Sequence, residues 1–382
     1  SNGRYLFKDY YTDSYVGAFY MGNPEGQWQG SLVQMFMPNP DVHAEKSNKY
    51  NIGIDASLFG KLHITADAFL DKRTDILTLD NSMMGYYGKN YYFNNVGKMT
   101  NKGFEVSALW SDQRGDWGYA INGSVSFNRN KIDYMAEVAP MYGYNAQTGR
   151  PYGTLIGLVA DGFYDIDDFE ADGTLRADLP QPMFGAVRPG DLKYRDLDNS
   201  GFIDQNDVTK IGKSLHPEWT YTLGAQFNYR GFDLSFLLHG IAGASFSLMD
   251  NAVQTRAFVD NGNAFPIAEG AWAYYPEQGI DTRETATYPR LTTQSNDNNY
   301  QLSSFWVRSR NFLRVRNIEL GYSFRHHAKF RAAGISDFRI YLNVTNPFTA
   351  SGLMSDYRID PELLSYRYPV LKSCNIGVNL TF

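Results

Sequence analysis

The chain has 382 residues and a formal net charge of −6 at pH 7 with no basic stripe, which argues against nucleic acid as a partner. It contains no run of about 18 apolar residues, so no transmembrane helix is predicted, and its one cysteine, Cys374, excludes a disulfide within the chain and a cysteine-based metal site. Aromatic residues make up 15% of the chain, which is typical of transmembrane β-barrels with their aromatic girdles.

Strands are predicted wherever apolar and polar residues alternate, because successive side chains of a strand point to opposite faces. The first such segment is 50–58, where Tyr50, Ile52 and Ile54 share one face and Asn51 and Asp55 share the other. The same pattern predicts eight further strands, near 62–70, 104–110, 117–128, 219–229, 232–238, 303–325, 338–344 and 376–382.

The strand near 303–325 changes phase along its length. Leu313 and Val315 occupy odd positions, whereas Ile318 and Leu320 occupy even ones. A β-bulge between the two pairs would return the apolar residues to one face, so a bulge is predicted there.

The two faces of these strands are expected to contact different surroundings. The apolar face should contact lipid, and its expected members are Ile54, Val106, Leu223, Leu320 and Val378. The polar face should line a lumen, and its expected members are Asp55, Glu105, Gln226 and Glu319.

The connections between predicted strands alternate in length. Short turns are expected near 59–62, 112–117, 229–232 and 325–337, and long connections over about 72–96, 136–217, 246–302 and 350–369. Outer-membrane barrels have short periplasmic turns and long extracellular loops, whereas a soluble sandwich would show the strand alternation alone. We therefore predict an all-β fold, a transmembrane antiparallel β-barrel with long extracellular loops.

The number of predicted strands bears on how the barrel closes. Bacterial single-chain barrels have an even number of strands, and an open sheet edge in lipid leaves backbone groups without hydrogen bonds. Nine strands are therefore expected to be the C-terminal part of a larger barrel, with the missing strands and any plug domain in an N-terminal remainder.

Several segments carry a family resemblance. The chain reads NPDVHAEK at 39–46 followed by YNIGID at 50–55, DKRT at 71–74, NVGKMTNKGFEV at 95–106, GDLKYRDLD at 190–198 and FLRVRNIELGY at 312–322. In this order, these segments resemble the SusC/RagA-type TonB-dependent transporters of Bacteroidetes. Ala44 stands where the family usually has tryptophan.

The resemblance implies a plugged barrel of about 22 strands in the bacterial outer membrane. It also implies import driven through TonB acting on the plug domain, a SusD-like surface lipoprotein as a lid, and pairs of transporter and lid that can dimerise. The expected cargo is oligosaccharides from glycan breakdown, with oligopeptides as the alternative. An outer-membrane barrel enzyme or an adhesin is the alternative from another class, but no catalytic motif occurs in the sequence and no catalytic residue is predicted.

A candidate calcium loop covers 196–207. Oxygen ligands fall at positions 1, 3, 5, 9 and 12 of a twelve-residue calcium loop, glycine at position 6 and a carbonyl ligand at position 7. Position 12 is aspartate, where an EF-hand has glutamate, and the flanks do not predict helices. The alternative is an acidic surface turn. The predicted ligands of a structural Ca²⁺ are Asp196, Asp198, Ser200, the Phe202 carbonyl, Asp204 and Asp207.

Aromatic residues cluster in the long connections. Contact with substrate or with the lid is predicted for Tyr86, Tyr87, Tyr91, Tyr92, Tyr142, Tyr144, Trp272 and Tyr274. Packing between loops, or an interfacial girdle, is the alternative role for such rings. Phe382 ends the last alternating segment, and it is predicted to be the terminal aromatic signal for barrel assembly.

Overall fold

The computed structural model describes residues 6–21, 27–36, 38–80, 93–251, 255–324, 334–365, 368 and 370–382. Four of the aromatic residues predicted to contact substrate lie outside these ranges: Tyr86, Tyr87, Tyr91 and Tyr92. Within the described ranges, no helix has the length and apolar character needed to cross a membrane.

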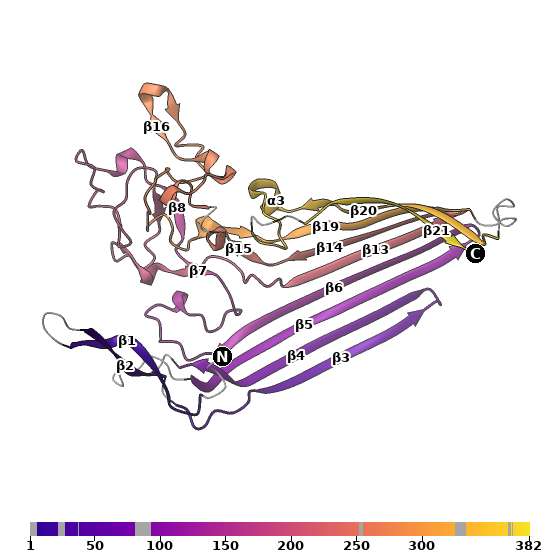
Figure 1. Cartoon of the computed structure of the whole chain (residues 1–382), viewed down its shortest axis with the longest axis horizontal. Coiled ribbons are helices and arrows are strands. Elements are labelled where there is room, and N and C mark those ends of the chain that lie inside the picture. The colour runs from indigo at the N-terminus through magenta and orange to yellow at the C-terminus, as the bar shows by residue number, and fades with distance from the viewer. Residues whose placement is uncertain are drawn as a thin grey trace. The chain divides into compact units, whose positions relative to one another are not determined.

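Nine strands form one sheet, and they are the nine that the sequence predicts (Figure 1). Their order in the sheet is β21-β20-β19-β14-β13-β6-β5-β4-β3, and the pairs from β6 to β21 are antiparallel. The strands are β3 (Lys46–Leu58), β4 (Leu62–Leu79), β5 (Phe93–Arg114), β6 (Trp117–Tyr134), β13 (Trp219–Tyr229), β14 (Phe232–Ala242), β19 (Phe312–Ser323), β20 (Asp337–Ala350) and β21 (Ser373–Thr381). The predicted antiparallel all-β fold is confirmed.

The chain divides into two compact units. The first comprises 1–51, 69–102 and 129–152, and the second comprises 52–68, 103–128 and 153–382. Strands β3 to β6 contribute residues to both units, whereas β13, β14 and β19 to β21 belong entirely to the second.

The sheet separates polar from apolar side chains as predicted. On one face, Leu320 pairs with Leu234 and with Leu342, and about half of the Leu320 side chain is exposed (48%). On the other face, Glu319 accepts hydrogen bonds from Arg339 (2.7 Å) and Asn343 (2.9 Å). The polar face also holds the hydrogen bonds Thr65 to Asp55 and Ser126 to Glu105. An exposed row of leucines beside a hydrogen-bonded polar row is the arrangement of a barrel wall between lipid and lumen.

The predicted bulge in β19 is confirmed. Leu237 and Leu238 of β14 lie opposite Asn317 and Val315, so Arg316 is the extra residue. The bulge places Leu313 and Val315 on the same apolar face as Leu320, and it leaves Arg316 on the polar face.

The connection between β4 and β5 is shorter than its predicted range. β4 runs to Leu79 and β5 begins at Phe93, so much of 72–96 is strand where a loop was expected. The residues of 72–75 are all polar, so the strand continues there without the alternation that identifies strands in a sequence. The sequence pattern also missed a separate two-stranded hairpin, β1 (Tyr10–Met21) with β2 (Gln27–Phe36).

The connection between β6 and β13 and the one between β14 and β19 contain short elements of their own. The strands are β7 (Ile156–Gly157), β8 (Ala160–Phe163), β9 (Gln181–Pro182), β10 (Leu192–Tyr194), β11 (Phe202–Ile203), β12 (Thr209–Lys210), β15 (Ser245–Ser247), β16 (Tyr274–Tyr275), β17 (Ile280–Asp281) and β18 (Val307–Ser309). Among the described residues of these connections lie eight 3-10 helices, at Gly143–Asn145, Ile166–Asp168, Gln205–Asp207, Leu248–Asn251, Val259–Asn261, Pro266–Gly270, Pro276–Gln278 and Ser304–Trp306. The helix α3 (Gly352–Tyr357) lies between β20 and β21.

The main cluster of buried apolar residues lies in the connections, and fewer buried apolar residues, such as Ile241 and Phe312, lie on strands of the large sheet. Leu192, Ile203, Leu248 and Trp306 belong to this single cluster, and all four are fully buried. Asp191, also fully buried, holds the cluster together through an ion pair with Arg290 (2.7 Å) and hydrogen bonds from Asn296 and Asn299 (both 2.9 Å). A buried charge with an ion-pair partner and several hydrogen bonds fixes the connections against one another.

The C-terminal residue allows a direct test. Phe382 follows β21 and is 82% exposed, so it contributes little packing energy to the described fold. We predict that Phe382 is an aromatic signal for barrel assembly, so deleting it should lower the amount of protein in the outer membrane. Quantitative immunoblotting of outer-membrane fractions measures this, and Phe382→Tyr is the matched control. Equal outer-membrane amounts of the deletion and the wild-type protein at normal expression would refute the prediction.

Candidate functional site

The predicted calcium loop folds around three carboxylates. Asp196, Asp198 and Asp207 each bring a carboxylate oxygen to within 4.8 Å of the other two. The chain turns at Gly201, whose φ of +82° is a conformation that glycine adopts without strain. This turn lets the amide of Ser200 donate to Asp198 (2.9 Å) and the amide of Gly201 donate to Asp196 (2.8 Å).

Asp207 differs from the other two because it is fully buried. Its two carboxylate oxygens accept hydrogen bonds from the amides of Leu197 (2.7 Å) and Asp204 (2.8 Å), which join the two ends of the loop. Burial raises the pKa of the Asp207 carboxyl, and the nearby charges of Asp198 and Asp196 raise the pKa further. A carboxyl whose pKa is raised by folding costs stability as the pH rises through that pKa, and a bound cation would remove this cost.

The remaining predicted ligands take different positions. Asp204 caps the 3-10 helix Gln205–Asp207 by accepting from the amide of Asn206 (2.6 Å), and it is not in the acidic group. Position 9 of a twelve-residue loop often binds calcium through a water molecule, so this placement is compatible with a site. The hydroxyl of Ser200 donates to the carbonyl of Phe202 (3.2 Å), which brings the predicted ligands at positions 5 and 7 together.

The described aromatic candidates pack against the chain. Gly190 lies so close to the ring of Trp272 that a Cβ at this glycine would come within 2.5 Å of it. The ring of Tyr274 faces the guanidinium of Arg283, with 4.2 Å between the ring centroid and Cζ. Tyr142 and Tyr144 stack on each other with their ring centroids 5.2 Å apart. These contacts give all four rings a role in the packing of the loops.

A pocket in the connection between β6 and β13 has a mixed lining. Its volume is about 950 Å³, and Phe169 contributes an aromatic ring. Arg176 forms a two-fold hydrogen bond with Asp178 at 3.0 and 2.8 Å, and both side chains line the pocket. The other lining residues include Asp167 and Glu170. A lining that combines one ring with carboxylates and a guanidinium can form hydrogen bonds with the hydroxyl groups of a ligand.

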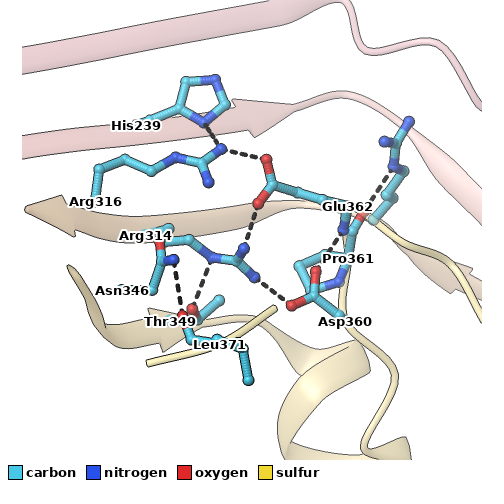
Figure 2. Close-up of polar contacts among 10 residues, drawn as sticks. His239, Arg314, Arg316, Asn346, Thr349, Asp360, Pro361, Glu362 and Leu371 are labelled. Carbon is cyan, nitrogen blue, oxygen red and sulfur yellow. Dashed lines mark hydrogen bonds and ion pairs between the residues drawn. The ribbon is translucent and has the colours of Figure 1, made fainter. Parts of the chain in front are cut away.

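Three arginines and two acids fix the connection between β20 and β21 over the polar face of β19. Figure 2 shows Arg314 between Asp360 and Glu362, with Nη2 2.7 Å from the Asp360 carboxylate and Nη1 bonded to Glu362. Arg316, the bulge residue, also binds Glu362. Arg310 donates to the carbonyl of Pro361 (3.0 Å). Arg314 and Asp360 are almost completely buried, at 1% and 4% exposure.

The alternation that predicts β19 did not identify this arginine cluster. Arg314 and Arg316 stand at ordinary polar positions of a strand, and their carboxylate partners are 46 or more residues away in the chain. The sequence signal that could have marked the cluster is the pair of arginines at and just before the predicted bulge, Arg316 and Arg314.

The sequence profile of a known family matches most of the chain. This family is described as "TonB dependent receptor-like, beta-barrel", and the match covers residues 7–347. The chain belongs to this family. The family model describes the β-barrel of these outer-membrane receptors, which agrees with the antiparallel sheet of this chain.

Relatives in this family are distant but match along almost the whole chain. The TonB-dependent receptor P39 of Formosa agariphila is 25% identical over 392 aligned residues, which cover 90% of this chain and 36% of the relative. The TonB-dependent receptor SusC of Bacteroides thetaiotaomicron is 24% identical, covering 90% of this chain and 32% of SusC. The chain therefore spans about a third of the length of the curated relatives that it matches.

Solved structures of a related transporter have the same fold. The RagAB peptide transporter matches 99% of this chain at 21% identity with a TM-score of 0.66, and the chain covers 39% of that protein. The RagAB peptide importer in its open-open state gives a TM-score of 0.67 at 20% identity, with 100% of this chain and 38% of that protein covered. The predicted resemblance to SusC/RagA-type TonB-dependent transporters is confirmed.

Proposed function

We propose that this chain forms part of the barrel wall and the extracellular loops of a TonB-dependent importer of oligosaccharides. The remaining strands and the plug domain would come from the rest of the same transporter, with TonB acting on the plug and a SusD-like surface lipoprotein acting as the lid. Membership of the family supports the transport role. The pocket at Phe169 supports the cargo, because its carboxylates and guanidinium can bond to many hydroxyl groups around one ring.

The sheet edges support a larger barrel. β3 and β21 are the outermost strands in the order of the sheet, and the side chains of β3 are exposed along nearly its whole length. Backbone groups at the edge of a sheet in lipid need hydrogen-bond partners, because lipid supplies none. Further strands on both edges would satisfy them.

The arginine cluster supports a lumen that is narrowed by the connection between β20 and β21. Arg314 and Arg316 hold the connection between β20 and β21 over the polar face, where we expect cargo to move. A segment fixed by buried ion pairs stays in place while cargo passes, so it would shape the lumen permanently.

Oligopeptides are the second candidate cargo. The observation that favours them is the fold similarity to the RagAB peptide transporter, to which 99% of this chain aligns. Peptide and sugar import would use the same barrel and the same energy input through TonB. They would differ in the groups that contact the cargo.

Uptake by intact cells separates the two cargo classes. Cells that lack the transporter gene should lose uptake of fluorescently labelled oligosaccharides, and complementation with the wild-type gene should restore it. A complementing gene that lacks the TonB box is the matched control and should not restore uptake. Unchanged oligosaccharide uptake together with lost peptide uptake would replace the first candidate by the second.

We also propose that the loop 196–207 binds one structural Ca²⁺. The residues present fit this ion, since three carboxylates lie within 4.8 Å of one another and one of them is buried. Calcium prefers flexible sets of oxygen ligands, whereas magnesium requires a near-ideal octahedron. The ion would hold Asp196, Asp198 and Asp207 together and so shape the loop that the lid or the cargo contacts.

Removing calcium should loosen this loop. At a free Ca²⁺ concentration 100 times its Kd, one bound ion would add about 2.7 kcal/mol to the stability of the loop. Chelation with EGTA should therefore speed proteolysis within 196–207, and the double substitution Asp196→Asn with Asp198→Asn should make proteolysis fast with or without calcium. Limited proteolysis followed by mass spectrometry gives both rates.

The matched control is Asp178→Asn, which removes an exposed carboxylate from the same connection outside the acidic group. This variant should keep the calcium effect. Equal proteolysis of the wild-type loop in calcium and in EGTA would show that the spacing of the carboxylates is coincidental.

A further inference from the structure

A second pocket of the long connections is lined by positive charge. Its volume is about 510 Å³, and three cationic side chains line it, those of Lys210, Lys213 and Arg308. None of its lining residues is acidic, and the remaining ones are Ile211, Gly212, Gly243, Ala244, Ser245, Val307, Ser309 and Asn311. This composition contrasts with the chain as a whole, whose net charge is −6.

The chain builds the pocket from three separated segments. The segment after β12 packs against β15 and β18, where the amide of Lys213 donates to the hydroxyl of Ser245 (3.0 Å). Gly212 makes this approach possible, because a Cβ at this position would come within 2.8 Å of Val307. The side chain of Asn311 accepts from the amide of Gly243 (2.9 Å). The pocket is therefore held by hydrogen bonds between its own lining residues.

The charge of the pocket is only partly balanced. Lys213 forms an ion pair with Glu218, with 2.7 Å between Nζ and Oε2. Within the described ranges, no carboxylate lies within ion-pair distance of Lys210 or Arg308. Two positive charges thus face this pocket without a counter-ion from the described part of the chain.

Arg308 is better positioned than Lys210 to bind an anion. It is half-buried, and all its described partners are neutral: the Tyr357 hydroxyl, the Phe305 carbonyl and the Val307 carbonyl (3.0 Å). The rings of Phe305 and Tyr357 lie 5.9 and 5.0 Å from its Cζ, so the guanidinium is fixed between them. These bonds use Nε and Nη1, and Nη2 has no hydrogen-bond partner among the described residues. A fixed guanidinium with a free N–H edge is suited to bind an oxyanion.

We propose that this pocket binds an anionic group of the cargo, a carboxylate or a sulfate carried by an oligosaccharide. This inference rests on the proposed import of oligosaccharides and adds that the cargo is negatively charged. Arg308 would hold the oxyanion through its Nη2 edge, and the flexible Lys210 would supply a second charge. Partial burial makes such a contact stronger than the same contact in water.

Binding to the purified, full-length transporter tests this inference. Isothermal titration should show that a uronate-containing or a sulfated oligosaccharide binds more tightly than a neutral one of the same length. Arg308→Gln should weaken binding of the anionic oligosaccharide about ten-fold or more, since a charge-assisted hydrogen bond is lost. Lys210→Gln should weaken it less. Raising the NaCl concentration should also weaken it, because salt screens charges near the surface.

The control variant is Arg195→Gln, which removes an arginine paired with Asp161 outside this pocket. Arg195→Gln should change the affinity for neither the anionic nor the neutral oligosaccharide. Comparing the uronate with the sulfated ligand shows which anion the pocket prefers, and a preference for either supports the proposal.

Two results would overturn the proposal. One is equal affinity for the charged and the neutral oligosaccharide in the wild-type protein, or an unchanged affinity in Arg308→Gln. The other is an acidic peptide that binds through Arg308 while anionic oligosaccharides do not bind. Failure of the import proposal would give a different result. Cells that lack the gene would still take up oligosaccharides, while the purified protein would still bind the anionic oligosaccharide more tightly than the neutral one.

Discussion

Replacing Arg314 by methionine should lower the free energy of unfolding by roughly 3–5 kcal/mol, because removing one partner of a buried ion pair leaves the other charge buried and unpaired. Arg314 is 1% exposed and Asp360 is 4% exposed, so Asp360 would have no water to replace the lost partner. Urea-induced unfolding of the transporter in lipid vesicles, followed by tryptophan fluorescence, measures the change.

Two further variants show whether charge is the cause. Thr349→Val removes only a hydrogen bond from Arg314 Nε (2.9 Å) and should cost about 1 kcal/mol. The double variant Arg314→Met with Asp360→Leu should recover part of the loss, because the unpaired charge is gone. A double variant that is less stable than Arg314→Met would show that packing, not the buried charge, determines the effect.

Placing a charge on the lipid face should have the next largest effect. Leu320→Arg should cost roughly 2–4 kcal/mol if Leu320 lies near the middle of the bilayer. Leu320 pairs with Leu234 and Leu342, so the new charge would meet only apolar neighbours. Unfolding in vesicles measures this cost as well.

The matched control carries the same change on the other face. Gln226 of β13 pairs with Ser235 and with Ala120, on the face that we expect to contact water. Gln226→Arg should therefore change the stability by less than about 1 kcal/mol. Equal costs at the two positions would show that the two faces do not differ in solvent, which would contradict the lipid and lumen assignment.

The wall of the barrel was predictable because its pattern is local. All nine strands of the large sheet followed from period-two alternation, and the phase change between Val315 and Ile318 located the bulge. The pattern failed where both faces of a strand are polar, as at 72–75, because no alternation marks a strand that continues beyond the apolar band.

The candidate sites were predictable only in part, for a physical reason. The acidic loop was visible because its residues lie within twelve positions of one another, and the structure brings Asp196, Asp198 and Asp207 together. The arginine cluster and the cationic pocket depend on contacts between distant segments, such as Arg314 with Asp360 and Gly212 with Val307. No local pattern encodes such contacts. The packing of Trp272 on Gly190 is a further contact between distant segments that no local pattern predicts.

The structure of the complete transporter, purified from outer membranes of cells grown on the polysaccharide, tests the account most directly. We expect β3 and β21 to be hydrogen-bonded to strands outside this chain, and density for an oligosaccharide to lie against the polar face that carries Glu319 and Arg339 or against the loop pockets above it. A closed nine-stranded barrel in which β3 pairs with β21, or a polar face turned toward lipid, would contradict the account.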